Sequence, residues 1–341
     1  MNTSKKIILG IVILLPFLLI SCLPEPEPYF QGELPSTPVN LAPFNTEYDD
    51  YNSTAPTLGS LIPFCFSTNR KTSGGNFDII YQPMTVSFSK ISGELAIING
   101  YSHWGVYQPT LDVINDAVDK ANTVGNEFGP YLVFNPNRKT NSDEFLLLYA
   151  TDITGKFQIG YTHNVDLNTF TEGAPLSAFA SDYNDLYPSF NSDLSNGDIL
   201  GIYFCSDRED DVFNIYFTPI DISDDNLIES LENLNDIEVA KVEALSSEYD
   251  DKCPYFFGDK MVFASNRPGG QGGYDLYYST FEDGQWSAPV NFGPTINSPE
   301  DEFRPILIEE YVDVAKFMMI FSSNRPGGKG GYDLYFVGID K

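Results

Sequence analysis

The sequence predicts an all-β fold, a five-bladed β-propeller whose blades are four-stranded antiparallel sheets. Two observations predict it. A Phe-x-x-[Asn/Asp]-Arg motif occurs five times, and successive arginines of the motif lie 68, 70, 59 and 58 residues apart. Between the motifs, short segments rich in Val, Ile, Phe and Tyr alternate with Gly, Pro and Asn turns, which is typical of antiparallel sheets. One such sheet cannot bury both of its faces, whereas units stacked around an axis can.

The arginine is the most selective position of this repeat. The chain has six arginines and thirteen lysines, and five of the arginines but none of the lysines occupy the motif. The position therefore favours a planar guanidinium over a positive charge alone. The five copies end at Arg70, Arg138, Arg208, Arg267 and Arg325, and the sixth arginine is Arg304.

A second element, [Asn/Asp]-[Asp/Glu/Ser]-x-x-Pro, precedes each copy of the arginine motif. Its copies begin with Asn52-Ser53, Asn126-Glu127, Asn184-Asp185, Asp250-Asp251 and Asp301-Glu302, and only the first lacks an acid. We expect each arginine to form a two-pronged ion pair with the acid of its own or a neighbouring blade: Glu127, Asp185, Asp251 or Glu302. Repetition in every blade favours a structural role for these pairs.

The same acids allow a functional interpretation. Placed near the start of the innermost strands, they would ring one mouth of the central channel. There they could hold Ca²⁺ or serve as the separated carboxylates of a glycoside hydrolase. The sequence assigns no catalytic residue and calls for no cofactor, and calcium stays open as an alternative.

A third element follows each arginine by about ten residues: an apolar strand that ends in Tyr or another large apolar group. It is clearest at Asp275-Leu276-Tyr277 and Asp333-Leu334-Tyr335. Two Gly-rich loops, Pro268 to Gly273 and Pro326 to Gly331, precede these strands. A phosphate-binding loop leads from a strand into a helix, whereas these loops lead from strand to strand, so we expect hairpin turns.

The segments FASNRPGGQGGYDLYYS (263–279) and FSSNRPGGKGGYDLYFV (321–337) carry this repeat most fully. Their pattern resembles the TolB-like, WD40-like propeller repeats, and the resemblance extends loosely from residue 37 to 341. It implies a β-propeller that serves as an interaction module. The Asn, Asp and Tyr content also resembles that of envelope proteins of Bacteroidetes-like bacteria.

The last unit has room for only three strands before Lys341. Residues 36–50 align with 287–301, which form the fourth strand of unit four and the turn into unit five. We therefore expect an N-terminal strand within 37–45 to complete the last blade, so that no sheet edge stays free. Two stretches interrupt the period and have helical spacing: 222–236 and Leu111 to Ala121.

The N-terminus resembles a bacterial lipoprotein signal. Lys5 and Lys6 precede an apolar run of 14 residues, too short to span a membrane, and Leu19-Ile20-Ser21-Cys22 resembles a lipobox. The resemblance implies a signal peptide over 1–21, lipidation of Cys22 and a Pro/Glu-rich tether over 22–36. Leu23 stands where an Asp would retain an enteric lipoprotein in the inner membrane, which favours the outer membrane and leaves the leaflet open.

Few other residues suggest chemistry. His103 and Trp104 form a candidate ligand-facing rim patch, although Trp104 also fits blade packing. The two histidines of the chain are too far apart in sequence to suggest a metal site. Cys65, Cys205 and Cys253 lie in apolar, strand-like contexts; we expect free buried thiols, with one disulfide as an alternative.

Two functions remain. A net charge of −29 excludes nucleic acid as a partner. The main interpretation is a non-enzymatic, lipid-anchored envelope scaffold that binds an envelope protein or a glycan. The alternative is a carbohydrate-active enzyme of the glycoside-hydrolase type, which predicts unpaired carboxylates and aromatic platforms at one mouth. It would fail if every repeated acid were engaged by its arginine and the channel held no other acid.

Overall fold

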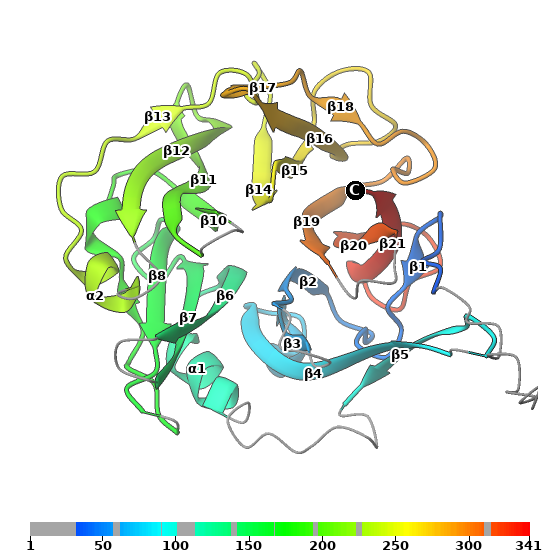
Figure 1. The fold of residues 1–341 in the computed structure, drawn as a ribbon, viewed down its shortest axis with the longest axis horizontal. Coiled ribbons are helices and arrows are strands. Elements are labelled where there is room, and N and C mark those ends of the chain that lie inside the picture. Colours follow the sequence, from blue (N-terminus) through cyan, green and yellow to red (C-terminus); the bar gives the residue numbers. More distant parts are fainter. Residues whose placement is uncertain are drawn as a thin grey trace, which may run out of the picture.

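The computed structural model describes residues 32–56, 62–89, 91–100, 113–137, 142–166, 168–193, 197–222, 227–309 and 315–341. Five antiparallel sheets surround a central axis, with β2, β6, β10, β14 and β19 innermost (Figure 1). The predicted five-bladed β-propeller is confirmed. Val, Ile, Phe, Tyr and Leu fill the space between the blades, where they pack as large buried clusters.

The blades follow one another along the chain. Blade one comprises β2 (Asp50–Thr54), β3 (Ile62–Thr68), β4 (Asp78–Phe88) and β5 (Leu95–Asn99). Blade two comprises β6 (Glu127–Asn137), β7 (Ser142–Thr151), β8 (Gln158–His163) and β9 (Ala174–Pro175). Blade three comprises β10 (Asp185–Ser192), β11 (Ile199–Glu209), β12 (Val212–Ile222) and β13 (Ala240–Lys241).

The last two blades show how the ring closes. Blade four comprises β14 (Asp251–Phe257), β15 (Lys260–Ser265) and β16 (Asp275–Glu282), and its outer edge is shared by β17 (Gln285–Trp286) and β18 (Val290–Asn291). Blade five comprises β19 (Glu302–Ile308), β20 (Lys316–Ser323), β21 (Asp333–Asp340) and β1 (Val39–Asn40). Val39 pairs with Phe336 on β21, as Val290 pairs with Tyr278 on β16. The N-terminal strand therefore completes the last blade, as predicted.

Two α-helices lie at the outer edge of the ring (Figure 1). Helix α1 (Val113–Ala121) buries Val113, Ile114 and Ala117 against the seam between blades one and two. Helix α2 (Leu227–Glu232) buries Leu227 and Leu231. Both fall inside the stretches with helical spacing, and α2 is shorter than the stretch that predicts it. The described residues also include two short 3₁₀ helices, Arg70–Thr72 and Ser177–Phe179.

Neighbouring blades are joined by one repeated hydrogen bond. The backbone N–H of the aromatic residue at the start of each third strand donates to the Asn or Asp side chain that directly precedes the innermost strand of the next blade. The five bonds run from Phe77 to Asn126, Phe157 to Asn184, Phe213 to Asp250, Tyr274 to Asp301 and Tyr332 to Asp49, at 2.8–3.1 Å. This position of the repeat thus holds the ring together between blades.

Some predicted features lie outside the described residues: the signal peptide, most of the tether, Cys22, His103, Trp104 and Arg138. Within the described ranges, no helix is long and apolar enough to cross a membrane.

Candidate functional site

Four arginines of the repeat pair with the carboxylate that opens the innermost strand of their own blade. The Nη2 to carboxylate oxygen distances are 2.5 Å for Arg70–Asp50, 2.8 Å for Arg208–Asp185, 2.5 Å for Arg267–Asp251 and 2.9 Å for Arg325–Glu302. In the last three, Nε donates to a serine instead of to the acid, so the expected two-pronged geometry is wrong. Each guanidinium also lies over a Phe ring of its blade.

These acids do not ring the mouth of the channel. Their side chains are fully buried inside the blades, and each also accepts a hydrogen bond from a Ser or Thr hydroxyl four residues earlier. Successive side chains of a strand point to opposite faces, so the residue after each acid faces the channel instead. The interpretation of the repeated acids as a calcium cluster or catalytic ring is therefore wrong.

The first copy of the acidic element is shifted in register. Asp50 pairs with Arg70, and Asp49 takes the inter-blade bond from Tyr332, so Asp49-Asp50 is the true first copy. The prediction chose Asn52-Ser53 because Pro56 lies four residues after Asn52. In blade one the position of the motif proline is held by Ser53, which removes the cue that aligned the other copies.

Among the described residues of blade two, no arginine pairs with the repeated acid. Thr151 pairs with Glu127 across the sheet, and the Asn126 side chain bonds to Asp152, so the arginine position is held by Ile153. The Phe-x-x-Asn-Arg match of this blade begins at Phe134 in its first strand, β6, whereas the other copies begin in second strands, and Arg138 itself lies outside the described residues. Tyr149 and Gly160 replace the Phe and Tyr that flank three of the other guanidinium groups, and a Cβ on Gly160 would lie 3.1 Å from the Tyr149 ring.

Glu127 is consequently a buried carboxyl without a cationic partner in the part of the chain that the structure describes. Its Oε1 accepts hydrogen bonds from Thr123 and Thr151, and its Oε2 is buried without a partner. Burial raises the pKa of Glu127 above its usual value, although the two threonine bonds oppose this shift. At least one repeated acid is thus not engaged by an arginine, and the condition that would have excluded an enzyme is not met.

Glu127→Gln is expected to keep or increase stability at pH 7. A raised pKa in the folded state means stability that is present below the pKa of the unfolded chain and is lost as the pH rises through the folded pKa. The neutral glutamine cannot undergo this loss. Urea unfolding at pH 4 and pH 7 should therefore show the variant gaining on the wild type with rising pH. Asp185→Asn, which strips Arg208 of its carboxylate partner, should instead be destabilised at pH 7; equal losses in both variants would contradict the assignment.

The channel mouth is lined by aromatic side chains. Each blade contributes two residues to it: the aromatic residue at the start of its third strand and the residue that follows its repeated acid. We call these ten residues the aromatic mouth: Phe77, Phe157, Phe213, Tyr274, Tyr332, Tyr51, Phe128, Leu186, Lys252 and Phe303. The rings form an almost continuous series, with centroids 4.4–6.2 Å apart from Phe157 through Phe128, Phe77, Tyr51, Tyr332 and Phe303 to Tyr274. Seven of the eight rings are half-buried, and Phe303 is buried.

The aromatic mouth carries its own polar groups. The Lys252 ammonium lies 4.2 Å from the centre of the Phe213 ring and 2.9 Å from Asp250 Oδ2. The Tyr274 hydroxyl donates to the same oxygen at 2.5 Å. Burial raises the pKa of Asp250, but the Tyr274 hydroxyl and the Lys252 ammonium outweigh it and hold this pKa below its usual value. Asp301 accepts a bond from the Tyr332 hydroxyl at 3.2 Å and, like Asp250, is half-buried.

Below the mouth, side chains fill the axis. Each innermost strand has a bulge two residues after its acid, where the backbone φ is 45–58°. The five bulge residues are Asn52, Gly129, Tyr187, Cys253 and Arg304. The Tyr187 ring lies against Gly129, beneath the Arg304 guanidinium, and its hydroxyl is 3.4 Å from Asn52 Nδ2. In four blades the bulge residue is followed by proline. A bulge leaves the next backbone N–H unpaired, and proline avoids this cost because it has no N–H.

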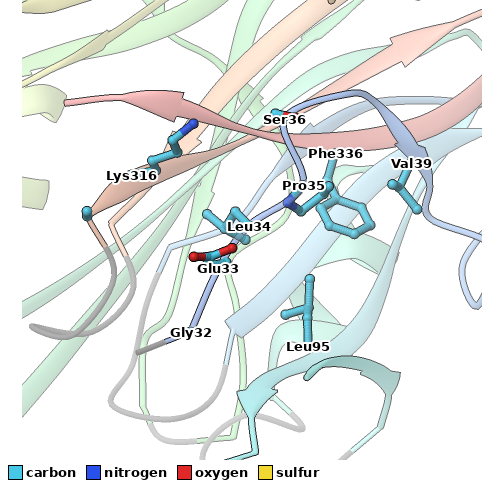
Figure 2. A pocket seen from close by; sticks show the side chains of 10 residues that line it. Gly32, Glu33, Leu34, Pro35, Ser36, Val39, Leu95, Lys316 and Phe336 are labelled. Atoms are coloured by element: carbon cyan, nitrogen blue, oxygen red, sulfur yellow. The ribbon is translucent and has the colours of Figure 1, made fainter. Parts of the chain in front are cut away.

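A pocket of about 830 Å³ lies elsewhere, at the edge of blade five (Figure 2). Leu34, Leu95 and Phe336 form much of its wall, and Glu33 is the one acid among its lining residues. A glycoside hydrolase needs two carboxyl groups. This pocket therefore lacks the groups for that chemistry, whereas Asp250 and Asp301 lie beside the aromatic mouth, bonded to the hydroxyls of Tyr274 and Tyr332.

Neither metal ligands nor disulfides mark a site in the described part of the chain. No three His, Cys, Asp or Glu side chains among the described residues gather as a metal site. Cys65, Cys205 and Cys253 are buried and free.

The chain was compared with protein families, curated proteins and solved structures, and only solved structures are similar to it. No protein-family model matches the chain. No curated protein matches it. Among solved structures, it is similar to the catalytic domain of a Coprinopsis cinerea GH62 α-L-arabinofuranosidase (12% identity, 91% of this chain and 97% of that one, TM-score 0.51). It is also similar to a thermostable family-43 glycoside hydrolase (12%, 89% and 92%, 0.51) and a Bacteroides thetaiotaomicron endo-arabinase (13%, 91% and 98%, 0.51).

Two expectations are corrected by these findings. The resemblance to TolB-like repeats is contradicted, because the similar structures are GH62 and GH43 glycoside hydrolases and no family model matches. The non-enzymatic scaffold is contradicted for the same reason, because the similar structures are glycoside hydrolases. The Asn-Arg and Gly-Gly-Tyr-Asp pattern suggested the TolB-like family, but its residues form ion pairs and turns within a blade and do not identify a family. At 10–13% identity, the likeness itself shows the fold.

The sequence prediction missed the aromatic mouth, although a signal was present. Each third strand starts with an aromatic residue, then Asp, Asn or Gln, then Ile or Leu: Phe77-Asp78-Ile79, Phe157-Gln158-Ile159, Phe213-Asn214-Ile215, Tyr274-Asp275-Leu276 and Tyr332-Asp333-Leu334. The Asp of this pattern also explains the Gly-rich loops, since Asp275 accepts the backbone N–H groups of Gln271 and Gly272. These amides already have a partner, which supports hairpin turns over phosphate loops.

Proposed function

We propose that the protein is a carbohydrate-active enzyme of the glycoside-hydrolase type that binds its substrate at the aromatic mouth. The half-buried series of rings carries this proposal. Sugar rings have apolar C–H faces that pack on aromatic side chains, while their hydroxyls need polar groups at the rim. The mouth offers both, because Tyr274 and Tyr332 place hydroxyls beside Asp250 and Asp301.

The charge of the protein narrows the substrate to a neutral glycan. A net charge of −29 repels acidic polysaccharides. Lys252, the one cation of the mouth, is already held by Asp250 at 2.9 Å and does not offer a free charge to a uronate or sulfate. The similar structures agree with a neutral substrate, since they include arabinofuranosidases, an endo-arabinase and complexes with cellotriose and xylotriose.

Glycoside hydrolysis needs one carboxylate and one carboxylic acid on either side of the scissile bond. Asp250 has a lowered pKa and is ionised at neutral pH, which suits a base or nucleophile. We assign the second role, protonation of the leaving oxygen, to Asp301, the half-buried carboxyl of the adjacent blade. Tyr274 connects the two, because its hydroxyl donates to Asp250 and its backbone N–H donates to Asp301.

The test is release of reducing ends from neutral arabinan, arabinoxylan and xylan. We expect Asp250→Asn and Asp301→Asn to lower kcat by about 10²–10⁴-fold. Phe157→Ala should mainly weaken saccharide affinity, measured by calorimetry, because it removes a stacking face without a polar group. Asp182→Asn, an exposed carboxylate, and Phe281→Ala, an aromatic ring on the outer part of β16, are the matched controls. The proposal is wrong if the wild type neither binds nor cleaves any neutral glycan.

We also propose that the protein is anchored to the outer membrane through Cys22. The lipobox-like Leu19-Ile20-Ser21-Cys22 and the Pro/Glu-rich tether support this address. Cells given labelled palmitate should label the wild type, and Cys22→Ala should lose both the label and the membrane fraction. Labelling that persists in Cys22→Ala would exclude this residue as the anchor.

A further inference from the structure

Arg304 differs from every other arginine of the described ranges. Its side chain is fully buried on the propeller axis, in the bulge of β19. Arg70, Arg208, Arg267 and Arg325 each lie within 3 Å of a carboxylate, whereas Arg304 has no such ion pair with a described residue. A buried guanidinium without a counter-charge is costly, because desolvation penalises the charged form.

The polar contacts of Arg304 do not replace a carboxylate. Nη1 and Nη2 each donate to a backbone carbonyl, of Pro254 and of Pro130, at 3.3 Å. Charge-assisted hydrogen bonds of this kind are normally about 2.7–2.9 Å long. Nε is buried and has no partner. A guanidinium has five N–H donors, so most of the donor capacity of Arg304 is unused.

The groups around Arg304 are neutral. Tyr187 presents its ring face 5.5 Å from the guanidinium carbon, and Tyr131, Tyr255 and Cys253 lie near enough to interact with its charge. Burial raises the pKa of each of these hydroxyl and thiol groups, for Cys253 to about 11, so all stay protonated at neutral pH. The axis therefore holds a positive charge within a neutral, aromatic surrounding.

A second strand at the axis also carries buried polar atoms without a hydrogen-bond partner. Asn52 holds the equivalent bulge position in β2, the innermost strand of the blade next to β19, and its Oδ1 is buried without a partner. The following residue, Ser53, has a buried hydroxyl that also lacks a partner. Buried polar groups in native proteins are almost always satisfied by protein, water or an ion. The Nε–H of Arg304 is an unsatisfied donor on an unpaired cation, which favours an ion of negative charge, whereas Asn52 Oδ1 is an acceptor and needs a donor such as water.

We propose that Arg304 anchors a binding site for a small monovalent anion of the size of chloride on the axis of the propeller. The guanidinium supplies the charge and the free Nε–H. A carboxylate ligand of substrate size does not fit this description, because the Tyr187 ring packs directly on Gly129 at the same level of the axis. The site is separate from the aromatic mouth and does not depend on the proposed function.

The experiment compares bromide with gluconate at one ionic strength, which holds screening constant. An anion that binds the folded state stabilises it by mass action. We expect the Tm of the wild type to rise by about 3 °C for each tenfold increase in bromide above its Kd. Arg304→Met, which keeps the length of the side chain without its charge, should lose this response. Arg325→Met should lower Tm but keep the response, because it removes a paired arginine.

Crystals of the wild type grown in bromide provide a measurement that does not rely on the variant folding. An anomalous bromide peak within hydrogen-bond distance of the Arg304 guanidinium would support the site. Equal Tm values in bromide and gluconate, or bromide peaks confined to the surface, would overturn it.

Discussion

Arg325→Met is expected to lower the free energy of unfolding by about 3–5 kcal/mol, because it leaves a buried carboxylate without its cation. Glu302 is fully buried, and Arg325 is its cationic partner at 2.9 Å. The same guanidinium donates to Ser323 and to the Ile296 carbonyl, so its loss also frees two acceptors within blade five. Urea unfolding with a two-state fit measures the change.

Blade two supplies the matched control for this prediction. Ile153 holds the arginine position there and is 47% exposed, with no ion pair to lose. Ile153→Met should therefore change the free energy of unfolding by no more than about 0.5 kcal/mol. If Arg325→Met were equally silent, the repeated pairs would contribute nothing to stability and their recurrence would need another explanation.

Gly129→Ala is expected to cost several kcal/mol, the sum of two separable effects. The Gly129 φ of 58° is unfavourable for a residue with a side chain, typically by about 1–3 kcal/mol. In addition, a Cβ at this position would lie 2.4 Å from Cδ1 of Tyr187, whose α-carbon is also close. Because Tyr187 is buried among the other bulge residues, overpacking should add about 1–3 kcal/mol.

Two further variants separate these effects. Gly284 has φ 79°, and a Cβ added there would meet nothing within 4 Å, so Gly284→Ala reports the backbone cost alone. Adding Tyr187→Ala to Gly129→Ala removes the clash, and the double variant should lose less than the sum of the single changes. Strict additivity would show that Gly129 and Tyr187 do not compete for the same space.

The sequence carried the architecture of single blades well, because within-blade contacts are local. The acid, the Ser or Thr four residues before it and the arginine of the same blade lie within about 30 residues, so their spacing repeats visibly. The match of 36–50 to 287–301 likewise predicted the strand that closes the ring. Where a local cue was missing or accidental, the prediction failed: Ser53 replaces the motif proline, and Arg138 matches the motif in the wrong part of blade two.

The functional surfaces were decided by tertiary structure. Phe157 and Tyr274 are more than 100 residues apart, yet both line one mouth, because every third strand starts at the same end of the ring. In the sequence, nothing distinguishes Asp250 and Lys252 from other charged residues. Only the fold brings Tyr274 next to this ion pair.

By itself, then, the sequence determined the strands, the number of blades and the closure of the ring, all of which follow from pleat alternation and short-range spacing. Only the folded ring decided that the repeated acids are buried, that aromatic side chains form the mouth and that Arg304 lies unpaired on the axis. The physical reason is convergence: five strands distant in sequence meet at one axis, and the chemistry there depends on which bulge residues face one another. No single repeat contains that information.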